Sequence, residues 1–355
     1  MIHYSPLGRK QGKAVTLIPE SGIRAPQIAS QNMEAAICYT TCAMTQCSRN
    51  KSEPLTVAYA SDDNYAALTA ISATSLLKHN PGAEVILVGC SLKPESIETV
   101  KSRVEKFGGS FRHVDVSGRI GYLQSIGASP YVSYATYSRI FIGELLPDLS
   151  GKVLYLDCDT LVVDSIAGLF DTDLRGNPLA LAPDAIHPAY KRVISLPADK
   201  PYYNAGVSLI DLGEWRKRRC MERLMDELGS PHGKNPLGDQ DIIVRVLNEE
   251  ITELDRRWNF LSQYVLYGRG EKPAIYHFSG NTLGRPWFTS SRHPMREAYR
   301  EAAREAGLPE TAEQAKPMPL EYRIQYWLYK ILPRPVFMPM CRLMLRIHIK
   351  LTYGV

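Results

Sequence analysis

Two aspartates one residue apart end an apolar run near the middle of the chain, where Leu154–Leu156 precedes Asp157, Cys158 and Asp159. In an extended backbone, side chains two positions apart point the same way, so both carboxylates can converge on one cation. Carboxylate oxygens suit Mg²⁺ or Mn²⁺, and such ions usually also bind substrate phosphates. The spacing therefore predicts a metal site for a phosphate-bearing substrate. The alternative is a pair of solvated acids at a turn.

A histidine at the end of a later apolar run is a candidate third ligand. His277 follows Ala274–Tyr276 and precedes Phe278-Ser279-Gly280. An imidazole would shift the preference of the site from Mg²⁺ towards Mn²⁺. A lone histidine is also often structural, and the residues alone leave both interpretations open.

Of three further polar segments, one follows a predicted strand, one leads into a predicted strand and one opens a predicted helix. Ligands of open α/β sheets bind beyond the carboxyl ends of strands, so these side chains are candidate substrate contacts. The first segment could bind a base and a ribose, and it lacks the GxGxxG pattern of dinucleotide folds. The second leads into a strand, and the third is an acid-amide pair that could bind sugar hydroxyls. The residues are Asp62, Asn64 and Tyr65; Asn204, Ala205 and Gly206; and Asp239 and Gln240.

Structural alternatives exist for these polar residues. Asp62–Tyr65 also fits a turn rich in helix N-cap residues, and Asp239 also fits a simple N-cap. Arg139 stands in a predicted helix beside apolar Ile140 and Phe141. An arginine on a buried side needs an anionic partner, for which phosphate and carboxylate would serve equally.

Strands and helices alternate from Leu55 onward, and this alternation predicts a mostly parallel sheet covered by helices. Short apolar runs predict strands at 55–60, 84–89, 111–116, 153–157, 179–182, 205–211 and 274–278. Helical spacing of apolar residues predicts helices at 65–78, 94–107, 134–146, 214–228, 240–248 and 293–306. Three regions result: a poorly ordered extension (1–53), an α/β domain (54–290) and a helical C-terminal region (291–355).

Composition sets limits on the function. The net charge of +5 over 355 residues is too small for the whole chain to be a nucleic-acid binder. The sequence has no uninterrupted apolar run of about 18 residues, so we expect no membrane span. It also shows no signal peptide pattern at its start. Seven cysteines, an odd number at irregular spacing, fit a reducing compartment. We therefore expect a cytoplasmic protein.

The tail from Leu320 combines aromatic and aliphatic residues with many arginines and lysines and almost no acid. This composition predicts peripheral attachment to an anionic membrane surface. Pro333, Pro335 and Pro339 are expected to break the tail into short pieces. The alternative is a terminal helix packed on the domain.

Taken together and in this order, the motifs from about Leu55 to Trp287 resemble glycosyltransferase family 8, whose bacterial members include lipopolysaccharide glucosyl- and galactosyltransferases. The resemblance implies a GT-A fold with a single nucleotide-diphospho-sugar-binding α/β domain. It also implies transfer of glucose or galactose, with retention of configuration, from a UDP-hexose to a hydroxyl of an acceptor glycan or glycolipid. Mn²⁺, or alternatively Mg²⁺, is the implied cofactor.

The resemblance also implies residue roles. Asp157 and Asp159 match the family's DxD motif, and His277 matches its third metal ligand. Gln240 and Asp239 match the catalytic pair near the reactive carbon of the donor sugar. Arg285 stands where the family has a diphosphate-binding lysine, after a segment longer than usual. The implied donor-binding set is Ala60, Asp62, Asn64, Tyr65, Arg139, Asp157, Cys158, Asp159, Asn204, Ala205, Gly280 and Arg285.

Two other functions remain open at this stage. The run 154–160 also fits the nucleophile strand of haloacid-dehalogenase-type phosphatases, with Asp157 attacking phosphate and Asp159 as general acid. That strand normally opens its domain, whereas about 100 patterned residues precede it here. The phosphatase interpretation also leaves Asp62–Tyr65 and Asp239–Gln240 unexplained. The second alternative is a non-catalytic or self-glycosylating module that binds a nucleotide sugar, in the manner of a glycogen-primer protein. The intact DxD motif and His277 argue against a non-catalytic site.

Overall fold

The computed structural model describes residues 54–119, 134–230, 235–267, 272–280, 285–309, 311 and 320–354. The predicted N-terminal extension, 1–53, and the segment 281–284 after His277 lie outside these residues. The structure therefore tests the α/β domain and the C-terminal helices.

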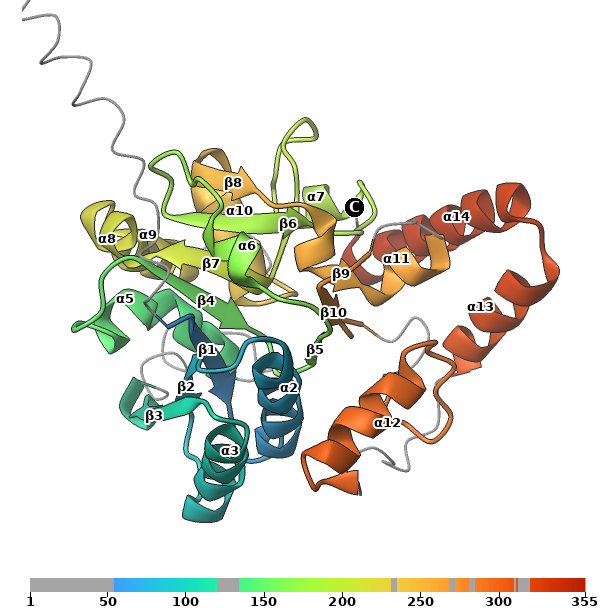
Figure 1. Cartoon of the computed structure of the whole chain (residues 1–355). Coiled ribbons are helices and arrows are strands. Elements are labelled where there is room, and N and C mark those ends of the chain that lie inside the picture. Colours follow the sequence, from blue (N-terminus) through green and yellow to red (C-terminus); the bar gives the residue numbers. More distant parts are fainter. Residues whose placement is uncertain are drawn as a thin grey trace, which may run out of the picture. The chain divides into compact units, whose positions relative to one another are not determined.

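A central sheet of seven strands has the order β3-β2-β1-β4-β7-β6-β8 (Figure 1). All neighbours run parallel except β7, which is antiparallel to both β4 and β6. The predicted mostly parallel sheet is therefore confirmed. Its strands are β1 (Thr56–Ser61), β2 (Glu84–Gly89), β3 (Ser110–Asp115), β4 (Lys152–Leu156), β6 (Leu179–Pro183), β7 (Tyr203–Asp211) and β8 (Ile251–Glu253).

A smaller sheet of three short strands lies at the end of β4, in the order β5-β10-β9. Its strands are β5 (Thr160–Val162), β9 (Phe260–Leu261) and β10 (Ile275–His277). β10 pairs antiparallel with β5, and this register sets His277 opposite Thr160. The sheet thus brings a segment from late in the chain next to the residues that follow β4.

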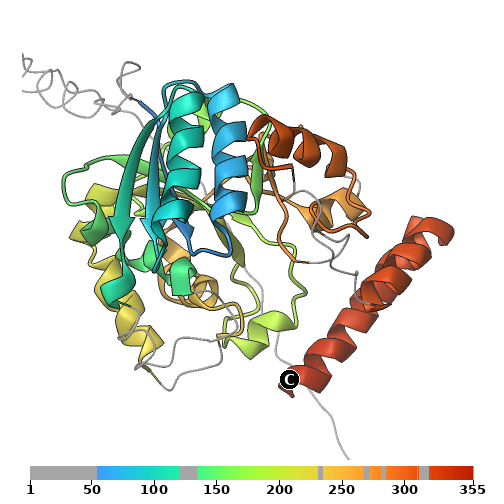
Figure 2. The ribbon, with the colours of Figure 1, turned by 90° about the horizontal axis from the view of Figure 1, so that it is seen from below.

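Successive strand residues point to opposite faces, so each face of the central sheet has its own apolar core. On one face, Val57, Leu87 and Leu154 pack with helices α2, α3 and α12. Figure 2 shows α2 and α3 side by side over the blue and teal strands. The helices that contribute to this core are α2 (Ala66–His79), α3 (Pro94–Lys106), α6 (Ala167–Phe170) and α12 (Arg296–Glu305).

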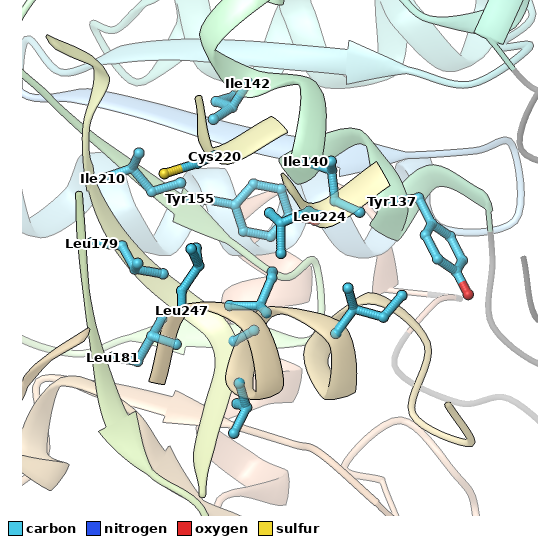
Figure 3. Close-up of a cluster of buried hydrophobic side chains, with 14 of the residues drawn as sticks. Tyr137, Ile140, Ile142, Tyr155, Leu179, Leu181, Ile210, Cys220, Leu224 and Leu247 are labelled. Carbon is cyan, nitrogen blue, oxygen red and sulfur yellow. The ribbon is translucent and has the colours of Figure 1, made fainter. Parts of the chain in front are cut away.

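The other face carries the second core, which includes Tyr155 of β4, Leu224 of α9 and Leu247 of α10 (Figure 3). The elements on this side include η2 (Tyr134–Phe141), a 3₁₀ helix, and α5 (Ile142–Leu145), α7 (Tyr190–Val193), α8 (Leu212–Lys217), α9 (Cys220–Leu228) and α10 (Asp239–Leu247). The remaining short elements are η1 (Ser117–Arg119), η3 (Asn248–Glu250), η4 (Arg256–Trp258) and α11 (Ser262–Tyr267).

Two predicted helices differ from the structure. The segment 214–228 is divided into α8 and α9 because Arg219 adopts a left-handed backbone with φ of 52°, which no helix interior accommodates. The segment 134–146 begins as 3₁₀ helix and becomes α-helical only at Ile142. The strands β5, β8 and β9 were not predicted, since two or three residues are too few for a periodic pattern.

The predicted helical tail is present as α13 (Leu320–Ile331) and α14 (Arg334–Tyr353). The prediction that Pro339 breaks the tail is wrong, because Pro339 lies inside the continuous 20-residue α14. Pro339 lacks the N–H that would bond to the carbonyl of Pro335, and α14 nevertheless continues past it to Tyr353. Near its C-terminal end, α14 buries Ile349 in the second core, and Tyr353 meets the ring of Tyr190 edge-on at 6.2 Å.

Arg216 connects α8 to the segment 143–149, which includes part of α5. Its guanidinium donates to the backbone carbonyls of Gly143 and Leu149, each at 2.9 Å, and also to that of Leu146. We expect Arg216→Met to lower the free energy of unfolding by about 2–4 kcal/mol, because partly buried carbonyls lose their donors. Urea unfolding measures the change. Arg219→Met, at an exposed site where the arginine pairs with Glu222, is the matched control and should change stability by less than about 0.5 kcal/mol.

Candidate functional site

The two acids after β4 and the histidine of β10 come together in the structure. Nε2 of His277 lies 3.1 Å from Oδ1 of Asp159 and 3.6 Å from Oδ2 of Asp157. One ligand atom from each residue lies within 4.8 Å of those of the other two. His277 is buried, whereas the side chain of Asp157 is 23% exposed, so the cluster is reachable from one side. Two carboxylates and one imidazole in this arrangement can hold a divalent cation.

The charges of the cluster favour a cation between these groups. Burial alone would lower the pKa of His277, but Asp159 and Asp157 raise it. Burial alone would raise the pKa of Asp159, but His277 and Arg285 hold it well below its usual range. The acids thus favour positive charge at the position that a divalent cation would take.

Gly206 of β7 has no side chain, and His277 and Asp157 occupy the space that a side chain would fill. A Cβ atom at this position would lie 2.2 Å from Cε1 of His277 and 2.6 Å from Oδ2 of Asp157. Atoms cannot approach that closely, so a side chain here would displace one of the two groups. The backbone of Gly206 also accepts a hydrogen bond from the amide of Asp157 at 2.8 Å.

Arg139 of η2 lies beneath the cluster, 4% exposed, and holds two acids from different elements. Its Nη2 lies 3.0 Å from Oδ1 of Asp157, and its Nε lies 2.6 Å from Oδ2 of Asp239. The guanidinium also donates to the carbonyl of Ala205 and stacks on the ring of Tyr155. Of the two partners that the sequence left open, the structure therefore supplies carboxylates. Burial raises the pKa of Asp239 to about 6, against the opposing charge of Arg139.

A second group of polar residues lies beside the cluster and is called here the Gln240 group. It consists of Gln240, Tyr202, Asp184 and Asn204. Oε1 of Gln240 accepts from the amide of Ala205 at 3.0 Å, and its Nε2 donates to the hydroxyl of Tyr202 at 3.0 Å and to Oδ2 of Asp184 at 3.3 Å. The same Asp184 oxygen accepts from Nδ2 of Asn204 at 2.9 Å. The predicted Asp239, Gln240, Asn204 and Ala205 are thus brought together.

Sequence reasoning missed Asp184, and it gave no role to Tyr202, which opens the segment 202–207 that contains Asn204. Asp184 is a polar residue directly after the apolar strand β6, which is the signal that identified Asp157 after β4. Tyr202 donates to Oδ1 of Asp241 at 2.6 Å, in a buried group that also includes Tyr190. No pattern in the sequence predicts a role for that tyrosine.

The predicted nucleotide segment lies at the carboxyl end of β1, one strand from β4 in the sheet. Oδ1 of Asp62 accepts from the backbone amide of Asn64 at 2.9 Å, which closes the turn that precedes α2. Tyr65 is partly buried, and burial raises the pKa of its hydroxyl against the nearby charge of Arg285. Buried Ala60 ends the apolar part of β1.

The remaining predicted residues are Arg285, Gly280 and Cys158. Arg285 pairs with Oδ2 of Asp159 at 2.8 Å. Gly280 adopts φ of 69°, a left-handed conformation that favours glycine over other residues. Cys158 carries a free thiol, whose pKa is raised well above its usual value by burial and by the adjacent acids.

A family model described as glycosyl transferase family 8 matches residues 56–290, about two thirds of the chain. The chain belongs to this family. Among curated relatives it is similar to General stress protein A of Bacillus subtilis, with 28% identity over 269 residues that cover 70% of this chain and 93% of the relative. It is also similar to the glycosyltransferase GlyF of Streptococcus pneumoniae, with 24% identity over 68% of this chain. The chain spans only 60% of GlyF.

Solved structures of related glycosyltransferases support the same family assignment. The galactosyltransferase LgtC, solved with donor and acceptor sugar analogues, superposes with a TM-score of 0.61 at 26% identity. The match covers 76% of this chain and 99% of LgtC. GlyE of Streptococcus pneumoniae shares the fold, with a TM-score of 0.56 at 23% identity over 71% of this chain and 60% of GlyE. The predicted GT-A fold is confirmed, and the chain is a family 8 glycosyltransferase.

The close approach at Gly206 gives a direct test of the cluster. We expect Gly206→Ala to weaken Mn²⁺ binding by about tenfold or more, because the new methyl group must displace His277 or Asp157. Titration with Mn²⁺ alone, followed by electron paramagnetic resonance, measures the affinity. Gly118→Ala is the control, since nothing lies within 4 Å of a Cβ there. Equal Mn²⁺ affinities of Gly206→Ala and the wild type would contradict the assignment.

Proposed function

We propose that the protein transfers glucose or galactose from a UDP-hexose to a hydroxyl of an acceptor glycan or glycolipid, with retention of configuration. The observation that carries the proposal is the convergence of Asp157, Asp159 and His277 at the edge of the sheet, beside the Gln240 group. The likeness to LgtC, a galactosyltransferase solved with donor and acceptor sugar analogues, supports it. Synthesis of lipopolysaccharide or another surface polysaccharide is the proposed setting.

The residues present fit a divalent cation. Two carboxylates and a neutral imidazole are ligands that Mn²⁺ accepts, with Mg²⁺ as the alternative, and Gly206 leaves room for the ligand atoms to converge. Mn²⁺ held by Asp157, Asp159 and His277 would neutralise the negative charge of the departing UDP. Arg285, paired with Asp159, would add positive charge near the diphosphate.

The segment after β1 is proposed to bind the nucleoside. Tyr65 offers a ring for stacking on uracil, and Asp62 and Asn64 offer polar atoms for the base or ribose. Ala60 and Cys158 are proposed to line the same site, and Gly280 to let the backbone approach the donor. Arg139, held by Asp157 and Asp239, contributes to donor binding by keeping these acids in place.

The Gln240 group is proposed to act on the donor sugar. Retention requires the acceptor hydroxyl to replace UDP on the same face of the sugar, whether directly or through two displacements. Gln240 and Asp239 would stabilise the positive charge that develops at the reactive carbon, and Asn204 and Ala205 would position the sugar. An active-site glutamine was replaced by glutamate in one solved LgtC variant, which supports a role for a glutamine in this fold.

The two alternative functions are not favoured by the family. In a phosphatase, the strand that carries the nucleophile would open the domain, whereas β4 follows three other strands here. A self-glycosylating primer would require transfer to the protein itself. Mass spectrometry of the intact protein after incubation with UDP-sugar separates that case from transfer to an external acceptor.

Removal of one proposed metal ligand tests the function. We expect Asp157→Asn to lose about 100-fold or more of Mn²⁺-dependent UDP-glucose or UDP-galactose hydrolysis, because metal stabilisation of the leaving group is worth several kcal/mol. Release of UDP with and without Mn²⁺ measures it. Asp148→Asn, an exposed acid paired with Arg112, is the control and should keep its activity. Unchanged Mn²⁺-dependent turnover of Asp157→Asn would reject the metal assignment.

We also propose that the region 291–355 attaches the catalytic region 54–290 to the inner face of the cytoplasmic membrane. None of the helices in the described residues combines the length and apolar character that a bilayer span requires. α13 and α14 nevertheless expose large apolar side chains beside basic ones, which suits the interface of an anionic membrane. These side chains are Leu320, Ile324, Trp327, Ile331, Val336, Leu343, Met344, Leu345, Ile347 and Leu351.

Vesicle binding tests the attachment. We expect co-sedimentation with vesicles of phosphatidylcholine and phosphatidylglycerol, weakened by salt, and weaker binding to phosphatidylcholine alone. Arg342→Glu combined with Arg346→Glu should lower the affinity by about tenfold or more, since each basic residue near the surface contributes about 1 kcal/mol. Lys101→Glu combined with Lys106→Glu, on α3, is the charge-matched control. A comparable loss of vesicle affinity in both double variants would show that binding depends only on net charge. That result would contradict a membrane-binding tail.

A further inference from the structure

His277 is held from behind by a side chain that the proposed function does not use. Its Nδ1 lies 2.9 Å from Oδ1 of Asn259, a fully buried residue between η4 and β9. Nδ2 of Asn259 donates to Oδ1 of Asn204 at 2.9 Å, and Nδ2 of Asn204 donates to Oδ2 of Asp184 at 2.9 Å. Four side chains from four segments thus form one chain of hydrogen bonds that ends on the imidazole.

The direction of this chain is set by the backbone of Gly206. The N–H of Gly206 meets Oδ1 of Asn204 at 3.0 Å, and a backbone amide can only donate. The Asn204 atom at this position must therefore be the oxygen, which turns its amide nitrogen towards Asp184. The same oxygen requires a donor from Asn259, so that residue presents its nitrogen to Asn204 and its oxygen to His277.

This direction determines which nitrogen of the imidazole carries hydrogen. An amide oxygen only accepts, so Nδ1 of His277 must be the donor. In the neutral ring the lone pair then lies on Nε2, the atom that is 3.1 Å from Asp159 and 3.6 Å from Asp157. A ring with hydrogen on Nε2 would instead direct that hydrogen at Oδ1 of Asp159, where it would occupy the cation site, and would leave a lone pair facing the lone pairs of Asn259.

We propose that Asn259 is a positioning residue that holds neutral His277 in the Nδ1–H form and turns its Nε2 lone pair to the cation site. The chain also links the two halves of the site, because Oδ2 of Asp184 accepts from both Asn204 and Gln240. This inference rests on the proposed function for the identity of the ligand at Nε2. The tautomer of His277 can be measured in the protein without metal.

The first test uses the unchanged protein. Long-range ¹H–¹⁵N correlation of the histidine rings, at a pH where they are neutral, reports which nitrogen carries hydrogen. The His277→Gln variant assigns the signal of His277 by its disappearance. We expect the Nδ1–H form for His277 in the wild type. A predominant Nε2–H form would overturn the proposal without any reference to metal or sugar.

The second test removes the acceptor. Asn259→Leu should allow the Nε2–H form to appear and should weaken binding of Mn²⁺ alone by roughly 10- to 100-fold, the usual effect of losing an outer partner of a metal-binding histidine. Asn259→Asp keeps an acceptor for Nδ1–H, so this variant should keep the Nδ1–H form and bind Mn²⁺ at least tenfold more tightly than Asn259→Leu. Weak binding by Asn259→Asp with an unchanged tautomer would also contradict the proposal.

Asn80→Leu separates positioning from general loss of structure. Asn80 is a buried amide outside the site that donates to the carbonyl of Leu76 and accepts from the amide of Ile166. Its variant should lose stability but keep the Nδ1–H form of His277 and the wild-type Mn²⁺ affinity. An equal loss of Mn²⁺ affinity in Asn80→Leu and Asn259→Leu would overturn the proposal. Failure of the wild type to bind Mn²⁺ would reject the metal site of the proposed function, and the tautomer measurement would still decide the role of Asn259.

Discussion

Burial of negative charge at the carboxyl edge of the sheet is the constraint on which the site depends. Asp159 and Asp239 are largely buried and Asp157 is partly so, and a carboxylate removed from water is costly unless it is paired. Arg139 pairs with two of these acids, and Arg285 and His277 pair with the third. Arg139 and Arg285 thus fix the positions of the acids, and the oxygens of Asp157 and Asp159 that face His277 are left for an added cation.

The topology explains why residues so far apart in the chain form one site. β4 lies in the middle of the sheet and its end leads directly into β5, so Asp157 and Asp159 lie where the chain passes from the large sheet to the small one. The antiparallel β7 brings Gly206 alongside Asp157, and β10 brings His277 opposite Thr160. The absence of a side chain at Gly206 then lets the two segments approach.

Much of this arrangement follows from the sequence. The apolar runs at β1, β2 and β4 alternate with helical spacing, and the acids after β4 and the histidine of β10 stand at strand ends where ligands bind. Other parts carry no local signal. β5, β8 and β9 are too short to show a period, and the break at Arg219 depends on one backbone dihedral angle. Asn259 is a single amide between Trp258 and Phe260, and its importance comes only from the tertiary contacts that bury it.

The hydrogen bonds of Gln240 and Asn204 bear on how such a site would act. Gln240 is held by hydrogen bonds with Ala205, Tyr202 and Asp184, and Asn204 is held by Gly206, Asn259 and Asp184. Their dipoles are therefore oriented before any substrate arrives. In the proposed transfer, positive charge develops at the sugar carbon while negative charge grows on the leaving diphosphate. Fixed dipoles and paired charges can stabilise both without reorganising, which is the condition under which electrostatic stabilisation contributes most to rate.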